Sequence, residues 1–136
     1  MATRGMYSFY DNVERYENEK PSASVYRHWD NYLEEGGVYL KDFLVEVKET
    51  VSDHRLDDAT FLASKYVVYL AREFATDWDK NPLDFMSVRV VEPYSDCGQE
   101  YHYHILCDSF ENGLPKVLVD GYDFDGENLF ELLDNL

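Results

Sequence analysis

Two histidines, His102 and His104, are separated by one residue in a segment that alternates in the manner of a strand. Residues two apart on a β-strand project from the same face of the sheet, so both imidazoles would point to one side. Imidazole binds transition metals and exchanges protons near neutral pH. The pair is therefore the first candidate for chemistry, although two exposed histidines on a solvent-facing strand give the same pattern.

A second pair with the same spacing is His28 and Asp30. If strand pairing placed this pair beside His102 and His104, the four side chains would form a three-histidine or two-histidine-plus-carboxylate metal site. Such a site would make the protein a metal-dependent hydrolase. The spacing alone does not establish that pairing. We therefore expect no metal and no cofactor, and keep the His/Asp cluster as the alternative.

The second pair belongs to a short motif, because residues 26–32 read Tyr-Arg-His-Trp-Asp-Asn-Tyr. With the opening Met-Ala-Thr-Arg, it resembles the Tyr-x-His-Trp-Asp-Gly-Tyr-Pro-Glu-Gly pattern of small uncharacterised phage and prophage proteins. The resemblance covers the first quarter of the chain, and Asn31 and Leu33 replace the Gly and Pro of the pattern. Asparagine tolerates a positive φ, so we expect Asn31 to preserve the turn. The resemblance implies a phage-type context and no activity.

Acidic residues dominate the composition, with 28 Asp and Glu against 12 Lys and Arg and a net charge of -16. Lys116 is the only basic residue after Glu92. Direct nucleic-acid binding would need clustered basic residues, and an anionic membrane would repel this chain. We expect an unidentified protein partner with a basic surface. We assign its binding surface to Asp120, Asp123, Asp125 and Glu127.

The same acidic run does not form a calcium-binding EF-hand loop. With Gly126 at the sixth position of such a loop, Gly121 and Leu132 would stand at the first and last ligand positions, which require acids. We instead expect a turn followed by a helix with Asp125 as its N-cap.

The leading functional interpretation is a non-enzymatic, acidic, phage-type accessory protein that binds another protein. The alternatives are the metal-dependent hydrolase and a DNA-mimic inhibitor, whose carboxylates would occupy a phosphate-binding groove of a host defence protein. An acidic surface can also serve solubility or adaptation to salt. No apolar run approaches the roughly 20 residues of a membrane span. We expect a cytoplasmic protein in which Cys97 and Cys107 are reduced.

The residues that position these side chains indicate one α+β domain over residues 1–136. Alternating or aromatic segments predict strands at 6–10, 23–28, 86–91, 101–107 and 117–119, with an Asn112-Gly113 turn before the last. Apolar stripes predict helices over 38–51 and from Asp57 or Asp58 to Phe74, separated by a polar break at 52–56, and a short helix over 127–136. We expect an antiparallel sheet of about five strands with the two long helices on one face.

Overall fold

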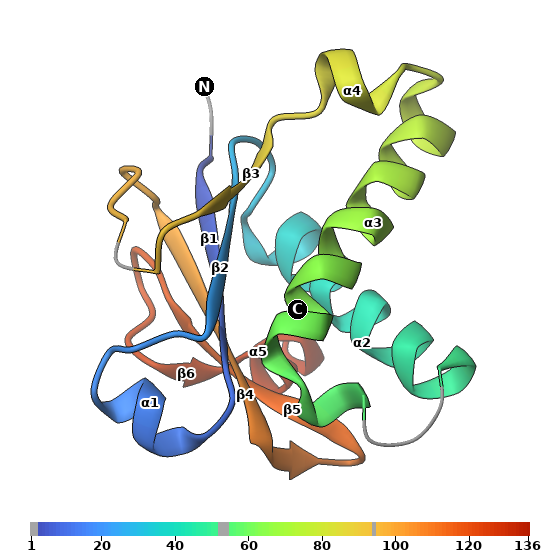
Figure 1. The fold of residues 1–136 in the computed structure, drawn as a ribbon. Coiled ribbons are helices and arrows are strands. Elements are labelled where there is room, and N and C mark those ends of the chain that lie inside the picture. Colours follow the sequence, from blue (N-terminus) through green and yellow to red (C-terminus); the bar gives the residue numbers. More distant parts are fainter. Residues whose placement is uncertain (1–2, 52–54, 94) are drawn as a thin grey trace.

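The computed structural model describes residues 3–51, 55–93 and 95–136. It has the expected α+β architecture, in which one sheet carries two long helices on one side (Figure 1). Met1 and Ala2, which open the motif resemblance, and residues 52–54 of the polar break lie outside the described residues.

The sheet is mixed and has six strands, so the expectation of about five antiparallel strands is wrong in both respects. The strands are β1 (Gly5–Tyr10), β2 (Ala23–Arg27), β3 (Val88–Val91), β4 (Tyr101–Glu111), β5 (Leu114–Asp120) and β6 (Glu127–Asn128), in the order β3-β2-β1-β4-β5-β6. The β1–β4 pairing is parallel. Because β2 occupies one edge of β1, β4 pairs at the other edge. The sixth strand is only two residues long, too short to show a period in the sequence.

Both long helices predicted from apolar stripes are confirmed. The helical segments are α1 (Val13–Glu17), η1 (Leu33–Gly37), α2 (Val38–Thr50), η2 (Arg55–Asp57), α3 (Ala59–Trp78), α4 (Pro82–Phe85) and α5 (Leu129–Asp134). The Asp58 carboxylate caps α3 by accepting from the Phe61 N–H at 3.1 Å. None of the helices in the described ranges has the length and apolar character needed to cross a membrane.

The N-cap of α5 differs from the expected Asp125. Asn128 caps this helix, because its Oδ1 accepts from the backbone N–H groups of Phe130 and Glu131. Residues Glu127–Asn128 first pair with β5 as a strand, so the helix begins later than the sequence pattern indicated.

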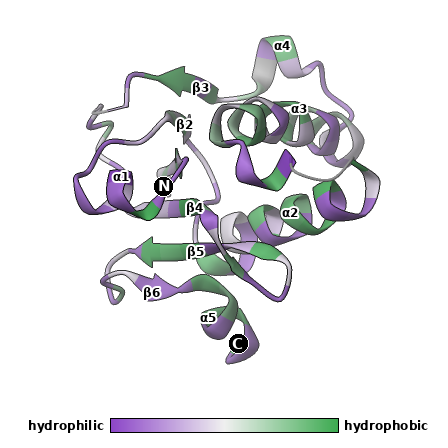
Figure 2. Ribbon diagram, turned by 60° about the horizontal axis from the view of Figure 1, so that its bottom comes forward, coloured by the Kyte–Doolittle hydropathy of each residue, from purple (hydrophilic) through white to green (hydrophobic). Residues whose placement is uncertain are grey.

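Helices α2 and α3 pack on one face of the sheet (Figure 1). The hydrophobic core lies between these helices and the sheet. Hydropathy follows this arrangement, since β5 is mostly hydrophobic and α1, on the other side, is largely hydrophilic (Figure 2). Tyr7 of β1 and Tyr103 of β4 are fully buried in this core and stack with ring centroids 4.9 Å apart. Alternation then directs the next residue of each strand to the opposite side. We call that side the open face; it carries Ser8, Tyr10, His102, His104 and Asp120.

The start of β1 and the end of β2 are joined by the buried side chain of Asn31. Its Nδ2 donates to the backbone carbonyls of Thr3, Arg27 and Trp29 at 2.7, 2.7 and 3.0 Å. Its Oδ1 accepts from the Tyr7 hydroxyl at 2.6 Å. The expected positive φ therefore falls on the neighbouring Asp30, at 60°, and not on Asn31. Asn31 is needed for its amide, whereas the turn is made by Asp30.

Replacing Asn31 by Asp should strongly destabilise the folded protein. A carboxylate has no N–H to donate to the three backbone carbonyls, and it brings a charge into the core. We expect Asn31→Asp to lower the free energy of unfolding by at least about 3 kcal/mol in a denaturant titration. The exposed Asn18 provides the control, since Asn18→Asp should change stability by about 0.5 kcal/mol or less. Equal effects of the two substitutions would refute the structural role of the Asn31 amide.

Candidate metal-binding site

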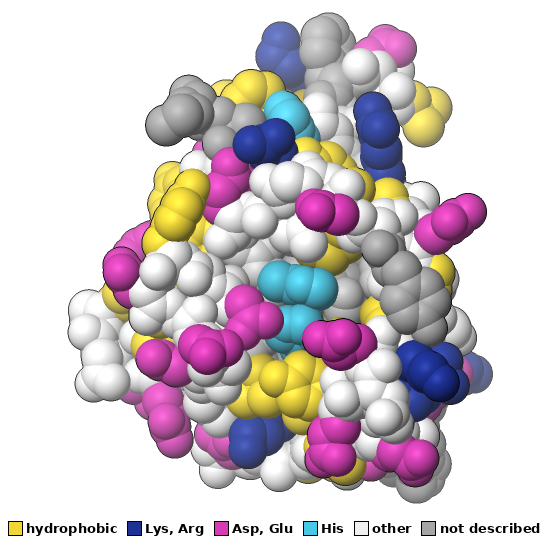
Figure 3. Space-filling view, turned by 90° about the vertical axis from the view of Figure 1, so that its left-hand side faces the viewer, with side chains coloured by type: hydrophobic (Ala, Val, Ile, Leu, Met, Phe, Trp, Pro, Cys, Tyr) yellow, Lys and Arg dark blue, Asp and Glu magenta, His cyan; other side chains and the backbone are white. Residues whose placement is uncertain are grey.

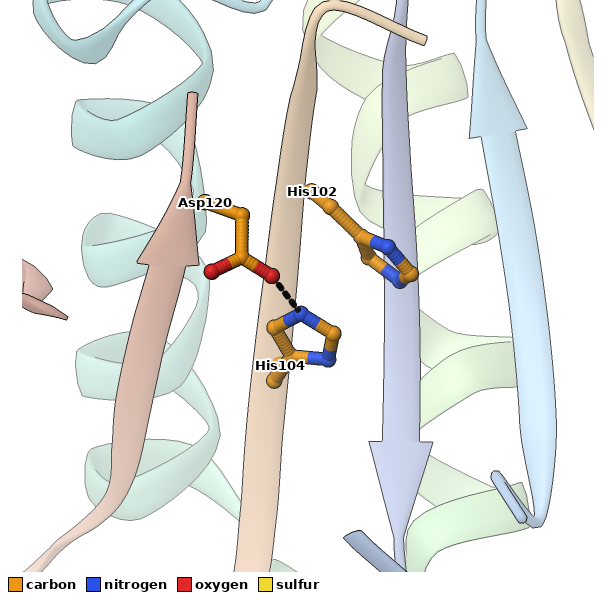
Figure 4. A group of neighbouring side chains, drawn as sticks. All are labelled: His102, His104 and Asp120. Atoms are coloured by element: carbon orange, nitrogen blue, oxygen red, sulfur yellow. Dashed lines mark hydrogen bonds and ion pairs between the residues drawn. The ribbon is translucent and has the colours of Figure 1, made fainter. Parts of the chain in front are cut away.

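Three side chains converge on the open face: His102 and His104 from β4 and Asp120 from the end of β5 (Figure 4). One possible ligand atom from each lies within 4.8 Å of the other two. Strand register explains this, because Asp120 pairs with His102 across β4 and β5 and lies diagonal to His104. We call these three residues the His–Asp cluster.

His104 is held by hydrogen bonds at both ring nitrogens. Its Nε2 lies 2.8 Å from Asp120 Oδ2, and its Nδ1 lies 2.8 Å from the Tyr10 hydroxyl. A carboxylate can only accept, so Nε2 donates to Asp120, and in the neutral tautomer Nδ1 accepts from the Tyr10 hydroxyl. The second oxygen of Asp120 accepts from the Gly126 N–H at 2.7 Å. Asp120 is thereby oriented by the turn that follows β5.

His102 is held by a serine of β1. Its Nε2 lies 2.7 Å from Ser8 Oγ, and that hydroxyl lies 3.2 Å from Ser24 Oγ of β2. The His102 and His104 rings stack with centroids 4.0 Å apart and an interplanar angle of 28°. Within the described ranges, no hydrogen bond occupies Nδ1 of His102. In the tautomer whose proton lies on Nε2 and is donated to Ser8, this nitrogen has a lone pair that a metal can use.

The electrostatics of the His–Asp cluster favour a neutral imidazole and an ionised carboxylate. Burial, and then the neighbouring His104, lower the pKa of His102 to about 3. The hydrogen bond from His104 lowers the pKa of Asp120, against the opposing effect of desolvation. Metal ligands must be deprotonated in this way. At neutral pH both groups are therefore in the form that coordinates a cation.

Aromatic side chains flank the His–Asp cluster and limit access to His104, which is 7% exposed. Tyr16 of α1 meets the His104 ring edge-on, with centroids 5.2 Å apart. Asp120 is more open, its side chain being 44% exposed. Figure 3 shows histidine side chains at the centre of this side of the molecule with acidic side chains around them. A small cation can therefore reach the site from the Asp120 side.

The other predicted metal ligands, His28 and Asp30, are not part of this group, so the structure does not bring the four predicted residues together. His28 Nδ1 bonds the Tyr26 hydroxyl at 2.7 Å, and the ring meets Trp29 edge-on. Asp30 is exposed in the left-handed turn after β2. Both follow the end of β2, whereas His104 lies opposite Ser8 in the middle of β1. The alternative of two solvent-exposed histidines also fails, because His104 is buried.

The residues assigned to a partner surface divide into two groups. Asp123, Asp125 and Glu127 are exposed around the turn after β5. Asp120 instead faces His104. Only the first three are therefore available to an approaching protein without breaking an internal contact.

Sequence reasoning missed Ser8 and Tyr10 as partners of the two histidines, and Asp120 as the third member of the cluster. The alternation of Tyr7 and Phe9 with Ser8 and Tyr10 was a usable signal, because it indicates a strand with one core face and one polar face. The sequence does not show which strand pairs with β1, because the β1–β4 pairing joins residues more than 90 positions apart.

The low pKa of His102 predicts a loss of stability in acid. The unfolded chain takes up a proton at this residue below about pH 6.5, whereas the folded protein does so only near pH 3. The free energy of unfolding should therefore fall below pH 6.5, by up to about 1.4 kcal/mol per pH unit from this residue. Denaturant titrations from pH 8 to pH 4 should show a shallower fall for His102→Asn. Parallel curves for the two proteins would contradict the assignment.

Comparison with known proteins adds no analogy for this site: no family model, curated protein or solved structure matches the chain.

Proposed function

We propose that this protein binds a divalent transition-metal ion, zinc foremost, through His102, His104 and Asp120. The observation that carries the proposal is the approach of three ligand atoms to within 4.8 Å of one another. Two histidines and one carboxylate are a common ligand set for zinc and for iron(II). The proposal replaces the expectation of no metal and exchanges His28 and Asp30 for Asp120.

The distances support the proposal with small side-chain movements. Two ligands of one tetrahedral zinc ion, at about 2.0–2.2 Å from the metal, lie roughly 3.3–3.5 Å apart. His104 Nε2 and Asp120 Oδ2 are 2.8 Å apart, so an ion replacing the proton between them would open this gap by about half an ångström. The His102 ligand atom would move inward from at most 4.8 Å.

Hydrogen bonds behind the ligands also suit a metal. Histidine ligands normally donate their other ring N–H to a neighbour, which sets the tautomer and the ring orientation. If a metal were held at Nε2 of His104, Nδ1 would carry the ring proton and donate it to Tyr10, whose oxygen can accept as well as donate. Ser8 is in the equivalent position for His102.

Three protein ligands would leave a coordination position for water. A catalytic zinc ion keeps such a position, and it lowers the pKa of bound water towards 7. The reaction class that follows is metal-assisted hydrolysis. Neither Ser8 nor Tyr10 serves as a nucleophile in this proposal, because they are 1% and 2% exposed.

Zinc titration of metal-free protein tests the proposal. We expect one equivalent to bind in isothermal calorimetry, and the affinity to fall at least about tenfold in His102→Asn and in Asp120→Asn. His28→Asn is the matched control and should bind like the unmodified chain. Absence of a saturable site, or binding that His102→Asn leaves unchanged, would exclude the metal site.

A second candidate function is binding of a basic protein partner through the exposed acids of the β5–β6 turn. The observation that favours it is that Asp123, Asp125 and Glu127 are all exposed and that Lys116 is the only base in this part of the chain. Such a field speeds encounter with a basic surface and is screened by salt. With this function the chain would be a non-enzymatic accessory protein of the phage type. A DNA-mimic inhibitor would use the same acidic surface.

Substitutions can separate the exposed acids that would bind a partner from Asp120, which holds His104. Neutralising Asp123, Asp125 and Glu127 together to Asn, Asn and Gln should leave the melting temperature equal or higher, because mutual repulsion is relieved. Association with a basic probe protein such as cytochrome c, measured at low salt, should slow. Asp120→Asn should instead lower stability, because an amide has one oxygen and cannot accept from both His104 Nε2 and the Gly126 N–H through separate oxygens. Unchanged association after the triple substitution would remove this candidate.

A further inference from the structure

A cavity lies on the helix side of the sheet, between the end of β2, the start of β3 and the C-terminal part of α3. Its volume is about 380 Å³. This falls within the range of about 300–1,000 Å³ that is typical of small-molecule sites. A smaller hollow of about 40 Å³ shares Arg27, Phe74 and Trp78 with it and extends towards Tyr39. The His–Asp cluster belongs to the opposite face, so this cavity has no part in the proposed metal site.

The walls of the cavity are aromatic and remain open to solvent. The chain has two tryptophans, Trp29 and Trp78, and both line this cavity together with Phe74. Trp29 is 49% exposed and Trp78 is 60% exposed. Indole rings contribute strongly to binding when a planar group stacks on them and excludes water. Two such rings in one cavity favour a flat aromatic ligand.

Arg27 places a positive charge in the wall of the cavity. Its Nη1 is buried, and no hydrogen-bond partner for this atom occurs within the described ranges. The guanidinium lies over the Tyr39 ring at 5.2 Å, and no carboxylate in the described part of the chain forms an ion pair with it. A guanidinium stays charged at all physiological pH values, and burial disfavours that charge; Asp30 acts on it electrostatically but forms no ion pair with it. An anion placed against Arg27 would remove this cost.

The other charged residues of the cavity limit the charge of the ligand. Of the charged side chains that line the cavity, Arg27 and Lys80 are basic and Asp30 is acidic. A single carboxylate also matches the planar fork of an arginine in two parallel hydrogen bonds. We infer that this cavity binds a small planar aromatic molecule that carries one carboxylate, with the ring between Trp29 and Trp78 and the carboxylate on Arg27.

Intrinsic fluorescence tests the inference directly, because both tryptophans line the cavity. The probes are 4-nitrobenzoate, a quencher with the required ring and charge, and the cation 4-nitrobenzylamine of nearly the same shape. We expect saturable quenching by the carboxylate and at least about tenfold weaker binding of the amine. In Trp78→Leu, Trp29 remains as reporter, and the affinity for 4-nitrobenzoate should fall at least about fivefold.

Two arginine variants separate the role of the cavity from general charge. Arg27→Lys keeps the charge but loses the fork, and should weaken 4-nitrobenzoate binding at least about threefold. Arg89→Lys is the matched control, because Arg89 is an exposed residue of β3 that neighbours the cavity residue Val88 and points to the other face of the sheet. It should bind the probe unchanged. If Arg27→Lys does not fold, the exposed Trp78 still decides the outcome.

Three results would overturn the inference: no saturation with 4-nitrobenzoate up to about 10 mM, equal binding of the amine, or equal affinity in Trp78→Leu. None of these outcomes depends on metal binding. Failure here is therefore distinct from failure of the proposed zinc site.

Discussion

The buried amide of Asn31 is the contact on which the rest of the structure depends. Two N–H groups serve three backbone carbonyls from the start of β1 and the end of β2, and the amide oxygen accepts from Tyr7. The backbone carbonyl of Asn31 also accepts from the Tyr103 hydroxyl at 2.6 Å. One residue therefore ties β2 to both central strands. It also sets where the chain leaves the sheet for η1 and α2.

Close packing around this amide explains two glycines. A Cβ at Gly5 would overlap the Asn31 side chain, and a Cβ at Gly36 would lie 2.6 Å from the Tyr7 hydroxyl. The strand and the helical turn can approach Asn31 only because these positions lack side chains. With β1 fixed in this way, its parallel pairing to β4 places Ser8 and Tyr10 beside the two histidines. The polar chain on the open face is thus a consequence of strand register.

The sequence alone predicts where the helices and strands lie better than it predicts which strands pair with each other. The apolar stripe and the Asp58 cap correctly indicate α3, and alternation in residues 101–107 correctly divides β4 into a core face and a histidine face. These are local signals, carried by spacings of two, three and four residues. Pairing of β1 with β4 joins residues more than 90 positions apart, so no local pattern reports it. The contact between His104 and Asp120 spans only 16 residues, but it depends on the register of β4 and β5, and a carboxylate at the end of a strand resembles any other acidic residue until that register is known.

The two candidate sites also lie in opposite electrostatic surroundings. On the open face, a cation bound to the His–Asp cluster would neutralise part of the net charge of -16. The electrostatic field of the whole protein therefore assists cation binding. In the cavity beside α3, an anion must approach against that same field and would be held only by Arg27 and Lys80 at short range. Dissolved salt screens the long-range field more than a partly buried contact. Salt therefore weakens attraction of a metal to the open face, while it reduces the repulsion that an anionic ligand meets on its way to the cavity.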